Sequence, residues 1–242
     1  MKPLNALSMN RIILSTLALL FSASLATANT NKTKSSEPNR TPVADVAIVI
    51  KTVKDVQAKI GNMPFKPAQR GQNLNSGDAV KTGDKSFSIL RFVDGSVIRI
   101  QENSEIKVRG EKADGKMEKT VDINFGKLGF NIKQKPGEQF RFTSPTSVAS
   151  IKGTNGAYTS DSEGSSLTIV EGKGEFETKD GKKFEVNSGE TAFVDNKGQS
   201  GKRKATQNEL NSATTSTKTG PFKVRFFDAD GNERIIEIPE QN

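Results

Sequence analysis

The chain of 242 residues contains no His, no Cys and no Trp, and it has a single Tyr. Without His and Cys it cannot form a Ser-His-Asp or Cys-His catalytic group, an imidazole and thiolate zinc site, or an iron–sulfur cluster held by thiolates. Disulfide bonds are excluded as well, so in an oxidising compartment the fold has to be stable through core packing alone. The chemistry that remains open is that of carboxylates, lysines, hydroxyl nucleophiles and oxygen-ligated Mg²⁺ or Ca²⁺.

Apolar residues are scarce too, at 33%, whereas the chain has 21 Gly. This polar, turn-rich composition is more typical of β architecture with solvated faces than of a helical bundle. Lys and Arg number 36 against 28 Asp and Glu, which gives a formal charge of +8. Such a modest excess is compatible with an anionic envelope surface but does not indicate nucleic acid, so we expect no nucleic-acid partner.

Residues 1–28 have the pattern of a signal peptide. Two positive residues precede the apolar run 12–21, and the small-x-small site Ala26-Thr27-Ala28 follows it. The run is roughly half the length that a membrane span needs, which disfavours the alternative of an uncleaved anchor. We therefore expect cleavage before Asn29, no transmembrane segment in the mature chain, and a periplasmic or secreted location.

The rest of the chain divides by composition. Residues 29–42 are polar and contain two Pro, which predicts a disordered tether. Between 43 and 196, short β-branched and aromatic segments are separated by Gly, Asp and Asn without a helical period, which predicts an all-β domain of the sandwich or barrel type. The polar stretch 197–220 predicts a linker with a short helix at 207–213, and 221–242 predict a C-terminal β-hairpin.

A series of short motifs, taken in order, is the next feature of the predicted β domain. The motifs are Gly77-Asp78, Asp94-Gly95-Ser96, Gly126-Lys127-Leu128-Gly129-Phe130, Ile151-Lys152-Gly153-Thr154, Val170-Glu171-Gly172 and Ser188-Gly189-Glu190. This order resembles the FecR domain, a periplasmic module named after the ferric-citrate signalling regulator, over roughly residues 46–194. The resemblance implies a jelly-roll-like antiparallel β-sandwich and a role in recognition, signalling or regulation in the Gram-negative envelope.

Two departures from the family pattern bear on function. Regulators of the FecR type carry a cytoplasmic tail and a membrane helix before the domain, whereas only eleven residues precede the short apolar run here. We therefore do not expect the transmembrane signalling form. The family usually has Arg before its Gly-Thr pair, and this chain has Lys152, which cannot make the bidentate contact of a guanidinium with a carboxylate.

Seven motif residues are interpreted as fold-defining rather than ligand-binding. Glycine permits positive φ where strands reverse, an Asp-Gly pair suits a tight hairpin, and a Thr after Gly can bond locally. These residues are Asp94, Gly95, Gly126, Gly153, Thr154, Gly172 and Gly189. We predict no catalytic, cofactor-binding or metal-binding residue, and we interpret Asp228–Glu233 as a hairpin turn rather than a calcium loop.

The predicted function is that of a non-enzymatic module that recognises a protein partner in the envelope through loops or an exposed strand edge. The alternative is a carbohydrate- or envelope-glycan-binding module, which the scarcity of Trp and Tyr disfavours because sugar platforms rely on flat aromatic faces. A glycosidase with paired carboxylates is a third hypothesis. The basic run 202–204 is predicted to be solvated, with anionic lipid or glycan binding as its alternative. The oligomeric state stays open.

Overall fold

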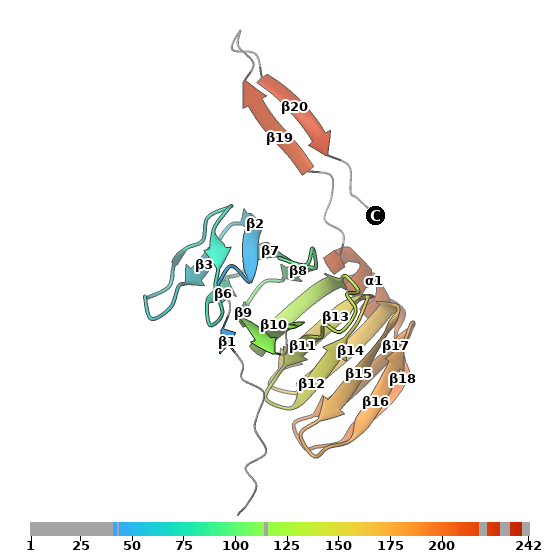
Figure 1. Cartoon of the computed structure of the whole chain (residues 1–242). Helices are drawn as coiled ribbons and strands as arrows, with labels where there is room; N and C mark the ends of the chain where they lie inside the picture. The colour runs from blue at the N-terminus through green and yellow to red at the C-terminus, as the bar shows by residue number, and fades with distance from the viewer. Residues whose placement is uncertain (1–40, 43, 114–115, 218–221, 228–232, 239–242) are drawn as a thin grey trace, which may run out of the picture. The chain divides into compact units, whose positions relative to one another are not determined.

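The computed structural model describes residues 41–42, 44–113, 116–217, 222–227 and 233–238 (Figure 1). The predicted signal peptide 1–28 and the tether as far as residue 40 lie outside the described residues. Thr41–Pro42, the end of the predicted tether, form a short strand paired with the main sheet, so the tether prediction is wrong for these two residues. No helix in the described part of the chain combines the length and the apolarity that crossing a membrane requires.

The protein is mostly β, as predicted. Its elements in chain order are β1 (Thr41–Pro42), β2 (Ala47–Val53), β3 (Val56–Lys59), β4 (Lys66–Pro67), β5 (Asn73–Leu74), β6 (Ala79–Thr82), β7 (Phe87–Phe92), β8 (Val97–Ile100), β9 (Ser104–Ala113), β10 (Lys116–Ile132), β11 (Phe140–Thr143), β12 (Ser147–Ile151), β13 (Thr154–Asp161), β14 (Gly164–Glu171), β15 (Lys173–Thr178), β16 (Lys183–Asn187), β17 (Glu190–Asp195), β18 (Ser200–Lys204), α1 (Gln207–Thr217), β19 (Phe222–Phe227) and β20 (Glu233–Ile238).

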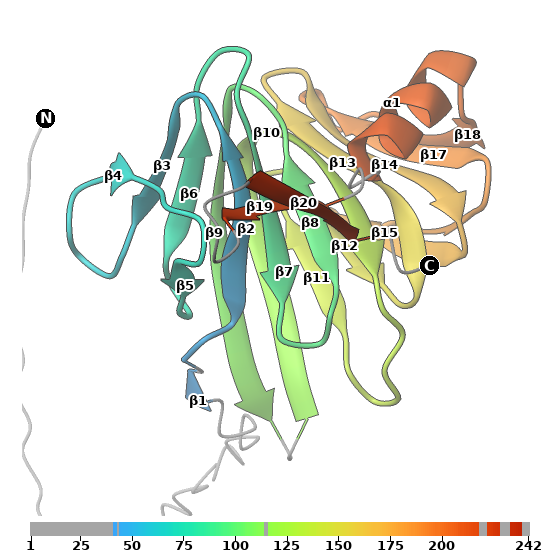
Figure 2. The same ribbon diagram turned by 90° about the horizontal axis from the view of Figure 1, so that it is seen from above.

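Strands β1 to β18 form one large mixed sheet, in which β10 belongs to two series of strands paired side by side (Figure 2). Each series is called a run and is named after one of its strands, β12 or β13. The β12 run contains β4, β3, β6, β9, the first half of β10, β11, β12, β15 and β16. The β13 run contains β5, β2, β7, β8, the second half of β10, β13, β14, β17 and β18. Strands β10 and β11 are parallel, so the prediction of a purely antiparallel sheet is wrong at this pair.

The passage of β10 from one run to the other depends on its centre. The register with β9 shifts between Ile123 and Phe125, and Gly126 follows with a φ of +132°. A Cβ on Gly126 would lie 2.3 Å from the Ser104 Oγ, which no real contact allows. Glycine is therefore required where β10 leaves β9 and begins to pair with β13.

Side chains from the two runs meet in one core. Phe142 of β11 has ring-centroid distances of 4.8 Å to Phe130 and 5.8 Å to Tyr158, which belong to the β13 run. Phe92 and Phe140 form an edge-to-face pair across the same interior at 4.9 Å. All five rings are buried, and such pairs add to the free energy gained from apolar burial.

A buried lysine ties the β7–β8 turn to β10. The Lys119 side chain is 1% exposed, and its Nζ lies 3.0 Å from an Asp94 oxygen and 2.5 Å from a Glu138 oxygen. The Asp94 side chain is 3% exposed, and its second oxygen accepts a hydrogen bond from the backbone N–H of Ser96. Because a buried charge is tolerated only when it is paired, the three groups stabilise the fold as a unit.

The C-terminal part differs from the predicted linker 197–220. Residues 200–204 form β18, which pairs with β17, and 207–217 form α1, which packs against β10, β13 and β14 with Ala213 fully buried. The basic residues 202–204 are exposed to solvent as predicted, but two of them also form ion pairs, Lys202 with Glu190 and Arg203 with Glu209. The linker prediction is thus wrong for β18, because a polar segment can be held by backbone pairing. The short helix predicted at 207–213 is confirmed within α1, which one small buried side chain helps to hold on the sheet.

Strands β19 and β20 pair antiparallel, from Phe222 opposite Ile238 to Phe227 opposite Glu233, as the predicted C-terminal hairpin requires. The turn at 228–232 lies outside the described residues.

Replacing Lys119 by Met should lower the free energy of unfolding by about 3–5 kcal/mol, because Asp94 would stay buried without a counterion. The double variant Lys119→Met/Asp94→Asn should recover part of this loss, since it removes both charges. Chemical denaturation measures the effect, with Lys107→Met on the exposed face of β9 as the matched control. Equal stability of the two Met variants would contradict the role assigned to Lys119.

The start of α1 predicts a dependence on acid pH. Glu209 receives hydrogen bonds from Arg203 and from the backbone N–H and hydroxyl of Thr206, and the Arg203 contact is the main cause that lowers its pKa to about 2. A carboxyl with a lowered pKa stabilises the folded state above its unfolded pKa of about 4.3 and stops doing so as the pH falls towards 2.

We expect Glu209→Gln to cost about 1 kcal/mol at pH 7 through loss of the capping interaction, and nothing further at pH 2. Amide hydrogen exchange at Ala213 as a function of pH measures the attachment of α1, with Glu185→Gln as the control. If the Gln variant keeps the acid-dependent loss of protection seen in the parent protein, another carboxyl is responsible.

Candidate binding groove

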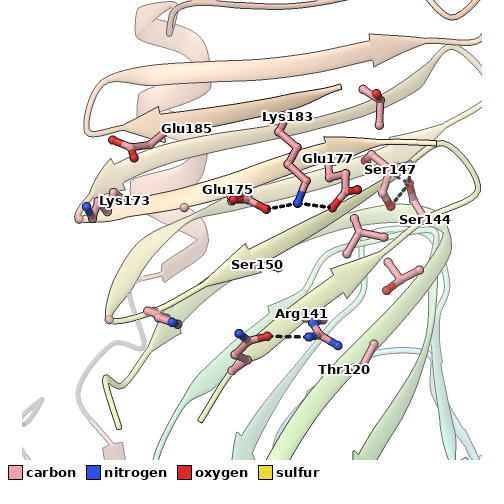
Figure 3. A pocket seen from close by; sticks show the side chains of 18 of the residues that line it. Thr120, Arg141, Ser144, Ser147, Ser150, Lys173, Glu175, Glu177, Lys183 and Glu185 are labelled. Atoms are coloured by element: carbon pink, nitrogen blue, oxygen red, sulfur yellow. Dashed lines mark hydrogen bonds and ion pairs between the residues drawn. The ribbon is translucent and has the colours of Figure 1, made fainter. Parts of the chain in front are cut away.

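The β12 run carries an open groove with a volume of about 1130 Å³ on the side facing away from the core (Figure 3). Strands alternate their side chains between two faces, so apolar residues enter the core and polar ones line the groove. On β11, Phe140 and Phe142 are buried while Arg141 and Thr143 line the groove. Other residues that line the groove are Val148, Ser150, Glu175, Glu177, Lys183 and Glu185.

Charges on the groove floor are largely paired with one another. The Lys183 Nζ lies 3.2 Å from a Glu175 oxygen and 3.2 Å from a Glu177 oxygen, and Figure 3 shows it between them. The hydrogen bond to Glu177, followed by the one to Glu175, raises the pKa of Lys183. Arg141 donates to Gln139 at 2.6 Å and to Glu118 at 3.3 Å. These exposed pairs add little stability, but they fix the arrangement of donors and acceptors on the floor.

Three of the predicted motif residues come together at one end of the groove. Gly153 has a φ of +60° and Gly172 a φ of +87°, and a Cβ on Gly172 would lie 2.8 Å from the carbonyl oxygen of Gly153. The Thr154 hydroxyl lies 2.7 Å from the carbonyl oxygen of Lys173 and 3.0 Å from that of Lys152. The corner therefore holds these two lysines at the groove, where neither has an ion-pair partner among the described residues.

A buried hydroxyl network lies at the other end of the floor. The Ser147 Oγ is 2.8 Å from the Tyr158 hydroxyl and 2.7 Å from the Ser165 Oγ, and Thr146 contacts the same Ser165 Oγ at 2.7 Å. Ser144 and Ser147 also line the groove. Burial raises the pKa of Tyr158, so its hydroxyl stays protonated and acts in hydrogen bonding. With no His in the chain, these hydroxyls have no imidazole base to activate them.

Neither this network nor the groove is predicted by the sequence. Its seven motif residues do not form one site. Gly153, Thr154 and Gly172 build the corner, whereas Asp94 and Gly95 form the β7–β8 turn. Gly126 lies at the β10 crossing, and Gly189 lies in the β16–β17 turn with a φ of +79° and open space around it. One sequence feature that could have indicated the network is the cluster of hydroxyl residues Ser144, Thr146 and Ser147 at the start of β12.

The described part of the chain contains no group of three or more carboxylates that could hold a metal ion. The chain thus combines a mostly β domain with an open polar groove, an arrangement suited to binding. Residues 78–175 match the family model described as "FecR protein", which confirms the resemblance over a stretch shorter than the predicted 46–194. Residues 78–175 thus correspond to a FecR-family domain.

Two solved structures, each described as a "putative anti-sigma factor" from Parabacteroides distasonis ATCC 8503, are similar to part of this chain. One, at 2.50 Å resolution, has a TM-score of 0.48 and 14% identity, over 55% of this chain and 62% of that one. The other, at 1.65 Å, has a TM-score of 0.48 and 12% identity, over 63% of this chain and 70% of that one. This chain thus spans less than two thirds of the first structure. No curated protein matches the chain.

Gly153→Val should lower the free energy of unfolding by about 1–3 kcal/mol, because a β-branched residue resists a φ of +60°. Gly153→Asn is the matched control. It adds a Cβ in the same place, close to Gln134, but Asn adopts left-handed backbone conformations more readily. Thermal unfolding compares the two variants. If Asn and Val cost the same, the contact with Gln134 rather than backbone strain limits this position.

Proposed function

We propose that this protein is a non-enzymatic FecR-domain module that binds an extended segment of an envelope protein in the groove of the β12 run. Binding of this kind would serve signalling or regulation, as the family relationship suggests. The proposal includes a jelly-roll-like β-sandwich and a periplasmic or secreted location after removal of residues 1–28. The sequence pattern of that segment supports the location.

The observation that carries the proposal is the lining of the groove. It is built by side chains from β9 to β12, β15 and β16 and offers hydroxyl, amide, carboxylate, ammonium and guanidinium groups in one open channel. A polypeptide presents amides and mixed side chains at regular spacing, which such a surface can satisfy. The lining contains no aromatic ring, and this disfavours the alternative of a glycan-binding module.

The charged side chains make one end of the groove different from the rest. At the Gly153 end, Lys152 and Lys173 have no acidic partner among the described residues, while Glu175 and Glu177 share Lys183 further along. A bound segment that places acidic side chains against the two lysines would gain attraction that no internal pair offsets. We therefore expect an acidic end on the bound segment.

An exposed strand edge, the other contact considered from the sequence, is less suitable at the end of the β12 run. The Lys202 Nζ donates to the backbone carbonyl oxygen of Glu185 on β16 at 2.9 Å. A lysine over an edge strand hinders the addition of a further strand. The groove, rather than this edge, is the surface that we assign to the partner.

The double variant Lys152→Glu/Lys173→Glu should reduce capture of the partner from an envelope extract by at least about tenfold, because two attractive contacts become repulsive. Lys54→Glu/Lys197→Glu makes the same charge change on lysines outside the groove and should leave capture unchanged. The immobilised mature chain is used for the pull-down, with a cytosolic extract in parallel and thermal unfolding as the folding check.

Equal capture by the two double variants would contradict the groove assignment. Enrichment from the cytosolic extract alone would contradict the proposed location. Retention on envelope glycans rather than on protein would favour the alternative function.

A further inference from the structure

The outward face of the β13 run contains a second site, independent of the groove. One row of residues in register crosses this face, from Lys51 through Ile89 and Arg99 to Gly129 and Ala157. The small residues in the row leave room for α1, which packs against β8, β10, β13 and β14. Figure 2 shows α1 beside β13 and β14. The larger, cationic residues of the row lie on β2 and β8.

A cleft of about 470 Å³ lies where α1 meets the ends of β7 and β8. Arg99, Phe87 and Lys85 line it from the β strands and the loop before them, and Asn211 and Ser212 line it from the helix. Its volume is that of a small-molecule site. Because residues of α1 form part of its wall, the cleft suits a compact ligand better than an extended polypeptide.

Two cations contact the Phe87 ring: Arg99, which lines the cleft, and Lys51, which is not among the lining residues. The guanidinium carbon of Arg99 lies 3.9 Å from the centroid of the Phe87 ring, and the Lys51 Nζ lies 5.4 Å from it. Neither cation has an ion-pair partner among the described residues. Partial burial lowers the pKa of Arg99. Stacking occupies the face of the guanidinium and leaves its edge donors for a ligand.

The surrounding charges have mostly the same sign. The Lys127 Nζ donates to the Ser212 Oγ at 2.6 Å on the wall of the cleft, and Lys85 is another of the lining residues. Glu102 is the one acid among the lining residues, and one of its oxygens accepts a hydrogen bond from the backbone N–H of Lys85 at 2.8 Å. The lining thus has two cations, Arg99 and Lys85, against one carboxylate, and Lys51 and Lys127 contact lining residues from outside it, which favours the binding of an anion.

We propose that this cleft binds a phosphate group through Arg99, with Lys51 and Lys85 adding to the attraction. A phosphate concentrates charge and acceptor oxygens in a small volume, and a guanidinium edge can donate two parallel hydrogen bonds to it. Such a group reaches an envelope protein either on a soluble phosphorylated molecule or on an anionic phospholipid headgroup. The groove lies on the other run of strands, so this binding does not rest on the proposed partner recognition.

The test is calorimetric titration of the mature protein with sodium tripolyphosphate at low ionic strength, together with sedimentation of phosphatidylglycerol vesicles against phosphatidylcholine vesicles. Arg99→Gln should weaken binding of the probe by at least about tenfold, because the bidentate contact is lost. Arg91→Gln is the matched control: it removes the same charge from β7, but Arg91 is not part of the cleft. It should change binding by less than about twofold.

Tripolyphosphate binding without vesicle binding would identify a soluble phosphate, and vesicle binding that Arg99→Gln abolishes would identify the lipid headgroup. Equal weakening by the Arg91 and Arg99 variants would overturn the proposal in favour of diffuse attraction, and so would the absence of binding to both probes. If Arg99→Gln does not fold, Lys51→Gln replaces it, with a weakening of at least about threefold expected. Capture of a protein partner should be unchanged in either variant.

Discussion

One strand, β10, holds the two halves of the structure together. Its first half pairs with β9 and β11 and its second half with β8 and β13, so both runs of the sheet depend on its course. The change of partners is possible because Gly126 adopts a φ of +132° against Ser104, where a side chain would not fit. Lys119, near the start of the same strand, adds a second constraint by joining the β7–β8 turn to the loop before β11 through Asp94 and Glu138.

These constraints also position both candidate sites. The outward side of β10 and β11 supplies Thr120 and Arg141 to the groove, while Lys127 after the crossing reaches Ser212 beside the phosphate cleft. Because strands alternate their faces, one continuous core of apolar side chains leaves two separate polar surfaces. The core and the sites are thus two consequences of the same alternation.

The two surfaces differ in how their charges are balanced. In the groove, cations and carboxylates lie close together, and Glu175 and Glu177 share Lys183. At the cleft, Arg99 and Lys51 contact an aromatic ring and have no carboxylate partner among the described residues. A surface whose charges are paired with one another can exchange these pairs for contacts with a polar polypeptide. Cations without a carboxylate partner attract a compact anion instead. The two outward surfaces of the domain thus differ in chemistry.

Local patterns in the sequence determined the class of fold and many of its turns. Alternation of apolar and polar residues predicts strands wherever one face is buried, and Gly95, Gly153 and Gly172 take the positive φ values that their turns require. Both properties depend on neighbouring residues, so they can be recognised without the fold. Because these patterns are local, they identify the motif residues of the FecR resemblance but not which of them come together in space. The sequence does not show that Gly153, Thr154 and Gly172 meet while Asp94 lies elsewhere.

Only the tertiary structure decided the remainder, because it depends on pairing between distant segments. The groove joins Arg109 to Glu185, and the hydroxyl network joins Ser147 to Ser165 across different strands. The polar composition of residues 197–220 predicts a linker with a short helix, yet β18 is held by backbone hydrogen bonds to β17, and α1 packs on the sheet over small residues. Composition predicts which side chains are buried. It does not predict backbone pairing, or the space that Gly129 and Ala157 leave for α1, because both depend on which strands become neighbours.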